Sequence, residues 1–318
     1  MKIAFLFPGQ GAQKVGMGAE LAREFAAARE AFAEADDALG VKLSTLCFEG
    51  PEEDLRLTAN TQPATLATSI AALRAFQAEF GVDAELAAGH SLGEYTALVA
   101  AGALEFPAAL RAVRERGRQM QEACPAGQGS MAALIGLDLA AVREVCAQVS
   151  QDGQIAVPAN LNAPGQIVIA GHAAAVRRAI EIAKERGAGA SVELKVSAPF
   201  HSPLMQPARD GMAPVIAALA VSAPRFGVIS NVTAEVNRDP ARIGPLLLEQ
   251  ITAPVRWEES MARLGASGAT SAIEFGAGRV LAGLMRRINK GFKVRSVEDP
   301  ASLRACGQAL AEEARAGA

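Results

Sequence analysis

The sequence predicts an α/β protein built mainly on a parallel sheet. Short apolar runs alternate with longer helical patterns along most of the 318 residues, as strands and helices do in parallel sheets. Half of the residues are hydrophobic and 20% are charged, which provides a sizeable core and excludes general disorder. At roughly 150 residues per domain, the length fits either two domains or one large domain with an insertion.

Charge and cysteine content exclude several classes of protein. The 31 Lys and Arg residues against 34 Asp and Glu residues give a formal charge of −3, whereas nucleic-acid-binding proteins usually have a basic face. No two of the four cysteines are close enough for a CxxC motif, so we expect reduced thiols in a cytoplasmic protein. No apolar run is long enough for a signal peptide or a membrane span. We therefore expect neither nucleic acid nor a membrane as a partner.

The first part of the chain is expected to supply the first two strands and the helices around them. The apolar run 2–7 ends at Pro8-Gly9 and predicts a buried strand. A helical pattern follows to about Leu39, and Gly40 is suited to end it. Pro63 is expected to open the next helix, which Gly81 closes. The remaining elements expected here are a strand at 86–89 and helices at 91–101 and from 107 to about 123.

A glycine-rich joint at 125–129 precedes a segment with a different pattern. Strands are expected at 130–136, 155–161, 166–170 and 190–196, and helices at 139–149 and 173–186. This β-α-β-β-α-β order within about 67 residues is the ferredoxin-like arrangement. We therefore expect a small ferredoxin-like domain at 128–196, inserted between the two parts, 1–127 and 197–318, of a large domain.

The large domain is expected to resume after the insertion. Helices are expected from 203 to about 219 and at 240–250, 254–264 and 278–288, with strands at 227–230 and 271–275. The segment 286–295 is the most basic of the chain. It either docks an acidic partner by electrostatic steering or is a solvated surface after a helix, and its charge alone leaves both interpretations open.

The strongest local signal for chemistry is the GxSxG motif Gly89-His90-Ser91-Leu92-Gly93. In a nucleophile elbow, small residues flank a serine where a strand turns sharply into a helix. The unpaired N–H groups and the dipole of the helix then favour negative charge beside that serine. The expected strand and helix around Ser91 fit this context. The alternative is a glycine-rich turn in which Ser91 only caps a helix.

A nucleophilic serine needs a base, and the chain has three histidines. His201 lies between two prolines at the expected joint of the two domains, where catalytic groups often gather. His90 adjoins Ser91 but should point to the opposite face of the strand, and His172 suits a helix start. His201 is therefore the preferred base. No Asp or Glu stands in a convincing position to orient it, and Gln250, at an expected helix end, is a different kind of candidate.

Two further segments are candidates for binding substrate. Glycines in the turn Pro8-Gly9-Gln10-Gly11 allow backbone N–H groups to face a ligand, and together with Leu92 this turn is a candidate oxyanion hole. Arg116 lies among four arginines in eight helical residues. Such a run is usually a solvated face, but one member can turn inward to pair with a carboxylate.

Several segments spread over nearly the whole chain carry a family resemblance. They are Phe7-Pro8-Gly9-Gln10-Gly11, Gly89-His90-Ser91-Leu92-Gly93-Glu94-Tyr95, Arg116-Gly117, residues 160–166, Pro199-Phe200-His201-Ser202-Pro203, Gln250 with residues 254–257, and residues 274–278. In this order they resemble the malonyl-CoA:acyl-carrier-protein transacylase family. Several motifs in the right order are far more specific than GxSxG alone.

The resemblance implies a role for each matching position. Ser91 is expected to accept the acyl group, His201 to act as its base, and Gln250 to hold the histidine through its backbone carbonyl. The N–H groups of Gln10 and Leu92 are expected to form the oxyanion hole. Arg116 is expected to bind the free carboxylate of a malonyl group. Phe200 resembles the malonyl-selecting version of its motif, and the other positions associated with the site are His90, Asn160 and Asn162.

The resemblance also implies a fold, partners and a reaction. The fold is an α/β-hydrolase-like core with a ferredoxin-like insert. The substrates are malonyl-CoA and acyl carrier protein, the reaction is ping-pong and needs no metal or other cofactor, and the protein is expected to be a monomer. Three alternatives remain open: an acyltransferase serving a polyketide synthase, a serine hydrolase or thioesterase, and a catalytically silent scaffold that binds acylated partners.

Overall fold

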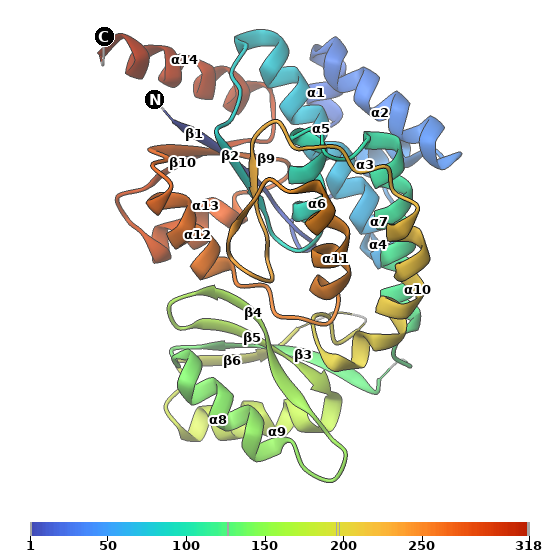
Figure 1. Cartoon of the computed structure of the whole chain (residues 1–318), viewed down its shortest axis with the longest axis vertical. Helices are drawn as coiled ribbons and strands as arrows, with labels where there is room; N and C mark the ends of the chain where they lie inside the picture. The colour runs from blue at the N-terminus through green and yellow to red at the C-terminus, as the bar shows by residue number, and fades with distance from the viewer. Residues whose placement is uncertain (1, 126, 195, 197, 317–318) are drawn as a thin grey trace.

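The computed structural model describes residues 2–125, 127–194, 196 and 198–316, and these form a larger and a smaller unit, each with its own sheet (Figure 1). The larger unit has six strands in the order β10-β9-β1-β2-β7-β8. The smaller unit, coloured green in Figure 1, has four strands and two helices. The predicted α/β class is confirmed.

The centre of the large sheet is β1 (Ile3–Phe7), whose five residues are all buried. It pairs in parallel with β2 (Leu86–Gly89) and β9 (Ser271–Phe275), both at the expected residues. β10 (Lys293–Val297) and β7 (Gly227–Ile229) extend the parallel sheet on either side, and β8 (Val236–Asn237) adds an antiparallel edge. Parallel strands end at the same edge of a sheet, so the loops after β1, β2 and β7 lie close together.

Helices cover both faces of this sheet, as expected for a parallel sheet with continuous apolar strands. On one face, Phe5 and Phe275 meet edge to face at 5.0 Å and join a core that includes α5. On the other face, Ala4 and Leu6 pack with α12 and α13. The helices are α1 (Ala19–Glu24), α2 (Ala26–Leu39), α3 (Leu43–Glu49), α4 (Glu52–Arg56), α5 (Thr58–Phe80), α6 (Leu92–Ala100), α7 (Phe106–Glu122), α10 (Gln206–Ala217, after the short 3₁₀ helix η1, Pro203–Met205), α11 (Pro240–Gln250), α12 (Trp257–Ala266), α13 (Val280–Ile288) and α14 (Pro300–Ala316).

The smaller unit is an antiparallel sheet in the order β4-β5-β3-β6 with its own apolar core. One strand of it, β4, also contacts the larger unit. Leu161 N–H donates to Val255 O, and Val255 N–H donates to Ala159 O, both at 2.9 Å, so β4 pairs briefly with the segment that precedes α12. The elements are β3 (Gly129–Ile135), α8 (Leu139–Val149), β4 (Ala156–Ala163), β5 (Gln166–His172), α9 (Ala173–Glu185) and β6 (Ala190–Glu193).

One expected helix start is wrong for an identifiable reason, and two other expected boundaries fall on residues outside those described. Pro63 does not open its helix: α5 begins at Thr58 and carries Pro63 inside. A proline inside a helix removes one backbone hydrogen bond, and α5 tolerates this loss near its start. Thr58 and Thr61, in the first turn of α5, are buried against the rest of the protein. Expected strand 190–196 includes Lys195, and the domain boundary at 196/197 includes Ser197; both residues lie outside those described.

The sequence pattern also missed elements near the C-terminus. The edge strand β10 begins within the basic segment 286–295, at Lys293, and α14 follows it. The side chains of Lys293 and Arg295 both pair with Glu313 of α14, in a segment that the sequence allowed to be a solvated surface after a helix. The other missed elements are α3, α4 and β8. Within the described ranges, no helix is both long and apolar enough to cross a membrane.

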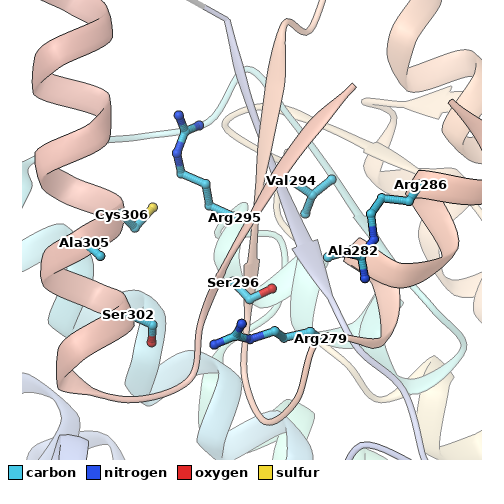
Figure 2. Close-up of a pocket in the computed structure, with 9 residues that line it drawn as sticks. All are labelled: Arg279, Ala282, Arg286, Val294, Arg295, Ser296, Ser302, Ala305 and Cys306. Atoms are coloured by element: carbon cyan, nitrogen blue, oxygen red, sulfur yellow. The ribbon is translucent and has the colours of Figure 1, made fainter. Parts of the chain in front are cut away.

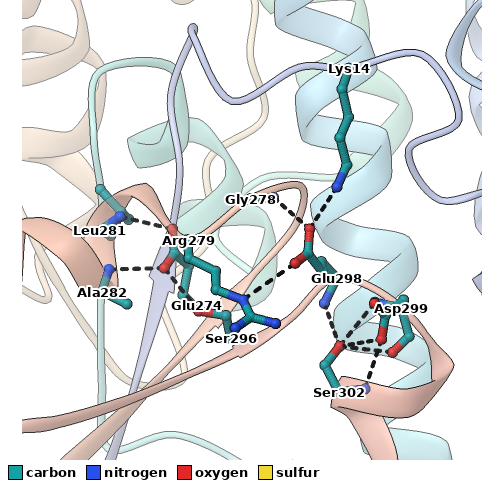
Figure 3. A network of polar contacts seen from close by, with 10 residues as sticks. All are labelled: Lys14, Glu274, Gly278, Arg279, Leu281, Ala282, Ser296, Glu298, Asp299 and Ser302. Atoms are coloured by element: carbon teal, nitrogen blue, oxygen red, sulfur yellow. Dashed lines mark hydrogen bonds and ion pairs between the residues drawn. The ribbon is translucent and has the colours of Figure 1, made fainter.

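Glu274, at the end of β9, holds the start of α13 (Figure 3). Its two carboxylate oxygens accept hydrogen bonds from the backbone N–H groups of Leu281 and Ala282, both at 2.9 Å. Ser296 of β10 donates to the same carboxylate at 3.2 Å. The side chain is fully buried, and this burial raises the pKa of Glu274. The carboxylate therefore joins β9, β10 and α13 at the edge of the sheet.

Replacing Glu274 by alanine is expected to lower the free energy of unfolding by about 2 kcal/mol or more, because the N–H groups of Leu281, which is buried, and Ala282, which is half-buried, lose their acceptor. Urea unfolding followed by circular dichroism measures the change. Glu52 is the control, because its pair with Arg56 leaves the two side chains 64% and 65% exposed. Glu52→Ala is expected to change the same quantity by at most about 0.5 kcal/mol. Equal effects of the two substitutions would contradict this assignment.

Candidate active site

Ser91 lies in the sharp turn between β2 and α6, as the GxSxG motif predicts. Its backbone has φ 51° and ψ −106°, a conformation that residues other than glycine rarely adopt. The flanking glycines permit this turn. A Cβ on Gly89 would lie 1.8 Å from the carbonyl oxygen of Gly93, and a Cβ on Gly93 would lie 2.1 Å from that of Phe7. The strand, the turn and the helix therefore approach too closely for any larger residue at these two positions.

His201 is the histidine that the structure brings to Ser91. Its Nε2 lies 2.7 Å from Ser91 Oγ, and its Nδ1 lies 2.8 Å from the backbone carbonyl oxygen of Gln250. A carbonyl only accepts hydrogen bonds, so Nδ1 carries the proton of the neutral ring and Nε2 accepts from the serine hydroxyl. His201 is itself held at φ 58°. No carboxylate is needed to orient it.

The environment of His201 strongly favours the neutral imidazole. Burial, followed by the positive charge of Arg116, lowers the pKa of His201 to about 3, and the bond to Gln250 opposes this shift. The ring is 3% exposed. At neutral pH it is therefore an acceptor ready for the serine proton. The same environment would hold this proton weakly on His201 until an anion binds beside Arg116 and offsets its charge.

Arg116 points inward, unlike its neighbours on α7. It is 1% exposed, and its Nη2 donates to Ser91 Oγ at 3.0 Å and to Gln250 Oε1 at 2.9 Å. Its Nη1 donates to Gln62 Oε1 at 2.7 Å. Arg118 shows the alternative arrangement, because its guanidinium pairs with Glu115 and Glu122 at the surface. Tertiary packing thus selects the one arginine of the run that reaches the serine.

The candidate oxyanion groups lie beside the same serine. Leu92 begins α6, so its N–H has no partner within the helix. Gln10 lies in the turn after β1, which packs against the elbow: a Cβ on Gly9 would lie 2.5 Å from the carbonyl oxygen of His90. The Gln10 side chain reaches Thr58 Oγ1 at 3.4 Å. Gln10 lines the cleft at Ser91, and Leu92 directly follows the serine in the chain.

A cleft of about 130 Å³ opens between the two units at Ser91. The small unit contributes Met131, Asn160 and Leu194 to its lining, and the large unit contributes residues on the opposite side. His90 lines the cleft. Its Nε2 forms a hydrogen bond of 2.8 Å with Oδ1 of Asn162, a residue of β4. Burial lowers the pKa of His90. The remaining lining residues are Gln10, Ser91, Val196, Phe200 and His201.

The chain is similar to known proteins over nearly its whole length. The model of the acyl transferase domain family matches residues 4–308. The malonyl CoA-acyl carrier protein transacylase of Bacillus subtilis is 50% identical over 98% of each chain. The crystal structure of an acyl-carrier-protein S-malonyltransferase from Burkholderia pseudomallei superposes with a TM-score of 0.94 at 47% identity, covering 97% of this chain and 100% of that one.

The chain belongs to the malonyl CoA-acyl carrier protein transacylase family. The resemblance predicted from the sequence motifs is therefore confirmed. A further similar structure is titled as a type II polyketide synthase acyl-carrier protein in complex with its malonyl-transacylase. It has a TM-score of 0.94 at 44% identity and covers 97% of this chain and 99% of that one.

Sequence reasoning missed three polar residues of this transacylase-family site: Gln62, Glu94 and Asn231. Asn231 follows β7; its Oδ1 accepts from Ser91 N–H, and its Nδ2 donates to Gly89 O, both at 2.7 Å. Glu94 is 3% exposed and accepts from Asn231 N–H. Apart from the position of Glu94 beside the elbow, no local pattern marks them, because each acts through contacts over more than 50 residues of chain.

A second cavity, of about 420 Å³, lies away from this cleft between α13, β10 and α14 (Figure 2). Arg279, Arg286 and Arg295 line it. Arg279 pairs with Glu298, and Arg295 pairs with Glu313. None of its lining residues lines the cleft at Ser91. Within segment 286–295, Lys293 and Arg295 share the one carboxylate of Glu313, and both interpretations of that segment stay open.

Gly89→Ala is expected to lower the free energy of unfolding by about 3 kcal/mol or more and to displace Ser91, because the added Cβ overlaps the Gly93 carbonyl. Thermal unfolding and acylation of Ser91 measure the two effects. Gly265→Ala in α12 is the matched control, since its Cβ would meet nothing within 4 Å. It is expected to stabilise by up to about 1 kcal/mol. Wild-type stability of Gly89→Ala would contradict the close approach.

Proposed function

We propose that this chain transfers a malonyl group from malonyl-CoA to the phosphopantetheine thiol of acyl carrier protein through a malonyl-Ser91 intermediate. The observation that carries the proposal is one serine oxygen with two partners. Ser91 Oγ lies 2.7 Å from the acceptor nitrogen of His201 and 3.0 Å from the guanidinium of Arg116. A nucleophile, its base and a carboxylate-binding cation thus meet at one atom, and the relatives are named for this reaction.

In the first half-reaction, His201 Nε2 takes the Ser91 proton while Oγ attacks the thioester carbonyl of malonyl-CoA. A bond forms between Oγ and the carbonyl carbon, and the carbonyl oxygen becomes an oxyanion, for which we assign the N–H groups of Gln10 and Leu92. The carbon–sulfur bond then breaks. His201 returns its proton to the sulfur, and coenzyme A leaves as a thiol.

The second half-reaction reverses these steps with a different thiol. The phosphopantetheine thiol gives its proton to His201, and its sulfur attacks the malonyl-serine carbonyl. The same N–H groups hold the oxyanion. Ser91 Oγ leaves with the proton from His201, and the malonyl thioester of the carrier protein is formed. Every proton and charge is handled by side chains and N–H groups, so we propose that no metal or other cofactor takes part.

Arg116 accounts for selection of a carboxylated acyl group. A buried guanidinium gains a bidentate partner when the malonyl carboxylate enters, and it stays without an anion when acetyl enters. The same carboxylate offsets the positive charge that lowers the pKa of His201. Binding of malonyl-CoA is thus expected to strengthen His201 as the base that takes the Ser91 proton. Phe200 is proposed to limit substituents on the acyl chain, and His90, Asn160 and Asn162 to border the bound substrate.

The small unit contributes one wall of this site. We propose that residues 128–196 are a ferredoxin-like domain inserted into an α/β-hydrolase-like domain of residues 1–127 and 197–318. The strand order and the two helices between strands support that assignment. The four cysteines are free and buried, which suits the reducing cytoplasm that we propose as the location of the protein. We also propose that the protein is a monomer.

The carrier protein can belong to fatty-acid or to polyketide synthesis. The similar structure that contains a polyketide carrier protein is the observation that keeps the polyketide alternative. A hydrolase with the same serine and histidine is disfavoured, because a buried arginine at the nucleophile serves a carboxylated acyl group rather than water. A silent scaffold is disfavoured by the complete serine–histidine pair.

Brief mixing with malonyl-CoA is expected to add one malonyl group to Ser91, as read by intact-protein mass spectrometry. Ser91→Ala should show no adduct, and carrier protein should discharge the adduct much faster than water does, because its thiol is the proposed acceptor. No adduct with any acyl-CoA would favour the scaffold. Discharge by water as fast as by carrier protein would favour the hydrolase.

Arg116→Ala is expected to reduce the acylation rate with malonyl-CoA by about 100-fold, as loss of a charge-assisted contact worth roughly 3 kcal/mol predicts. The acetyl-CoA rate should fall much less or rise. Stopped-flow acylation with both substrates gives the ratio, and Arg118→Ala on the exposed side of α7 is the control. Unchanged malonyl transfer without improved acetyl transfer would remove Arg116 from the binding role.

A further inference from the structure

Glu94 is a buried carboxylate behind the nucleophile that the proposed reaction steps do not use. It lies in the first turn of α6 and is 3% exposed. Its Oε2 accepts from Gln250 Nε2 at 2.6 Å and from Asn231 N–H at 3.1 Å. Both donor residues are fully buried. A carboxylate in such a place is costly unless its hydrogen bonds are needed.

Both partners of Glu94 hold the backbone of Ser91. Asn231 Oδ1 accepts from Ser91 N–H, and Gln250 Nε2 donates to Ser91 O at 3.0 Å. The peptide groups on the two sides of the nucleophile are thus clamped by the two residues that Glu94 contacts. Because Ser91 has a strained backbone, these two hydrogen bonds stabilise the conformation in which its Oγ faces the cleft.

Glu94 also sets which way the Gln250 amide points. The two hydrogens of Nε2 are directed to Glu94 Oε2 and to Ser91 O, whereas Oε1 accepts from Arg116 Nη2 at 2.9 Å. A flipped amide would place oxygen against a carboxylate and a carbonyl, and N–H against a guanidinium. The negative charge of Glu94 therefore fixes the orientation in which Gln250 connects the nucleophile to Arg116.

We propose that Glu94 is a positioning residue for the transfer reaction, which holds Ser91 and Arg116 in register through Gln250 and Asn231. The proposal rests on the proposed function. Its carboxylate touches neither substrate nor the reacting atoms. Its effect is therefore expected on the acylation rate rather than on the Michaelis constant for malonyl-CoA.

The charge state of Glu94 gives this role a signature. Burial, opposed by hydrogen bonds from Asn231, Gln250 and Ser230 and by the charge of Arg116, raises the pKa of Glu94 to about 7. The other titratable groups around the serine are the two histidines, whose pKa values lie below their usual range, and Tyr95, whose pKa burial raises to about 12. When Glu94 takes up a proton, the hydrogen bonds that it accepts lose their charge assistance. Acylation should therefore slow as the pH falls through about 7.

The test is the single-turnover acylation rate with malonyl-CoA between about pH 6 and pH 8.5, in wild type and in Glu94→Gln. Glutamine keeps an acceptor oxygen but has no charge, so the variant resembles protonated Glu94. Its rate is expected to be about tenfold below wild type at high pH and to lack the step near pH 7, with the Michaelis constant unchanged. A step that persists in Glu94→Gln, or equal rates at high pH, would overturn the proposal.

Two further variants make the result specific. Glu274→Gln removes another buried carboxylate, which does not line the cleft at Ser91, and is expected to lower the melting temperature while leaving the pH step intact. Glu94→Asp keeps the charge and withdraws it by one methylene, so the step should move or shrink. If Glu94→Gln does not fold, this variant decides, and an unchanged step overturns the proposal. A wild type that forms no malonyl adduct would instead refute the proposed function.

Discussion

The close approach of three backbone segments at the elbow is the constraint on which the site depends. β1, the turn after β2 and the start of α6 come together where Gly89 and Gly93 leave no space for a Cβ. This contact places Ser91 in the turn after β2, with a backbone conformation that residues other than glycine rarely adopt. Such a conformation persists only when surrounding bonds hold it, and Asn231 and Gln250 provide those bonds on both sides of the residue.

The electrostatics of the site follow from burying a cation beside the base. Arg116 and His201 are almost fully buried, and burial together with the positive charge of the arginine keeps the histidine neutral. In a serine hydrolase triad a carboxylate supports the imidazolium. Here a backbone carbonyl holds the ring, and the buried carboxylate, Glu94, faces Gln250 instead. The charge that would support the imidazolium is therefore expected to come from the acyl group itself.

The two units are joined where the chemistry occurs. β4 belongs to the small sheet, yet it pairs with Val255 of the large unit, and this contact brings Asn160 to the cleft. The histidine lies just after the small unit in sequence, and Gln250 ends a helix of the large one. Substrate binding thus depends on both units, whereas the serine, its base and the groups that hold them belong to the large unit or its edge.

The sequence by itself determined the sheet class, most strands and helices, and the sharp turn that carries Ser91, because glycine spacing and apolar periodicity are local. It also determined the family, since several motifs occur in order. Residue patterns alone left open which arginine of α7 turns inward and what orients His201. The family resemblance indicated Arg116 and the Gln250 carbonyl, and the tertiary structure shows the contacts that these groups make. Gln62, Glu94 and Asn231 join the site through contacts between residues distant in the chain. The physical reason is that local patterns fix secondary structure, whereas a buried polar network is specified only when its donors and acceptors are packed together.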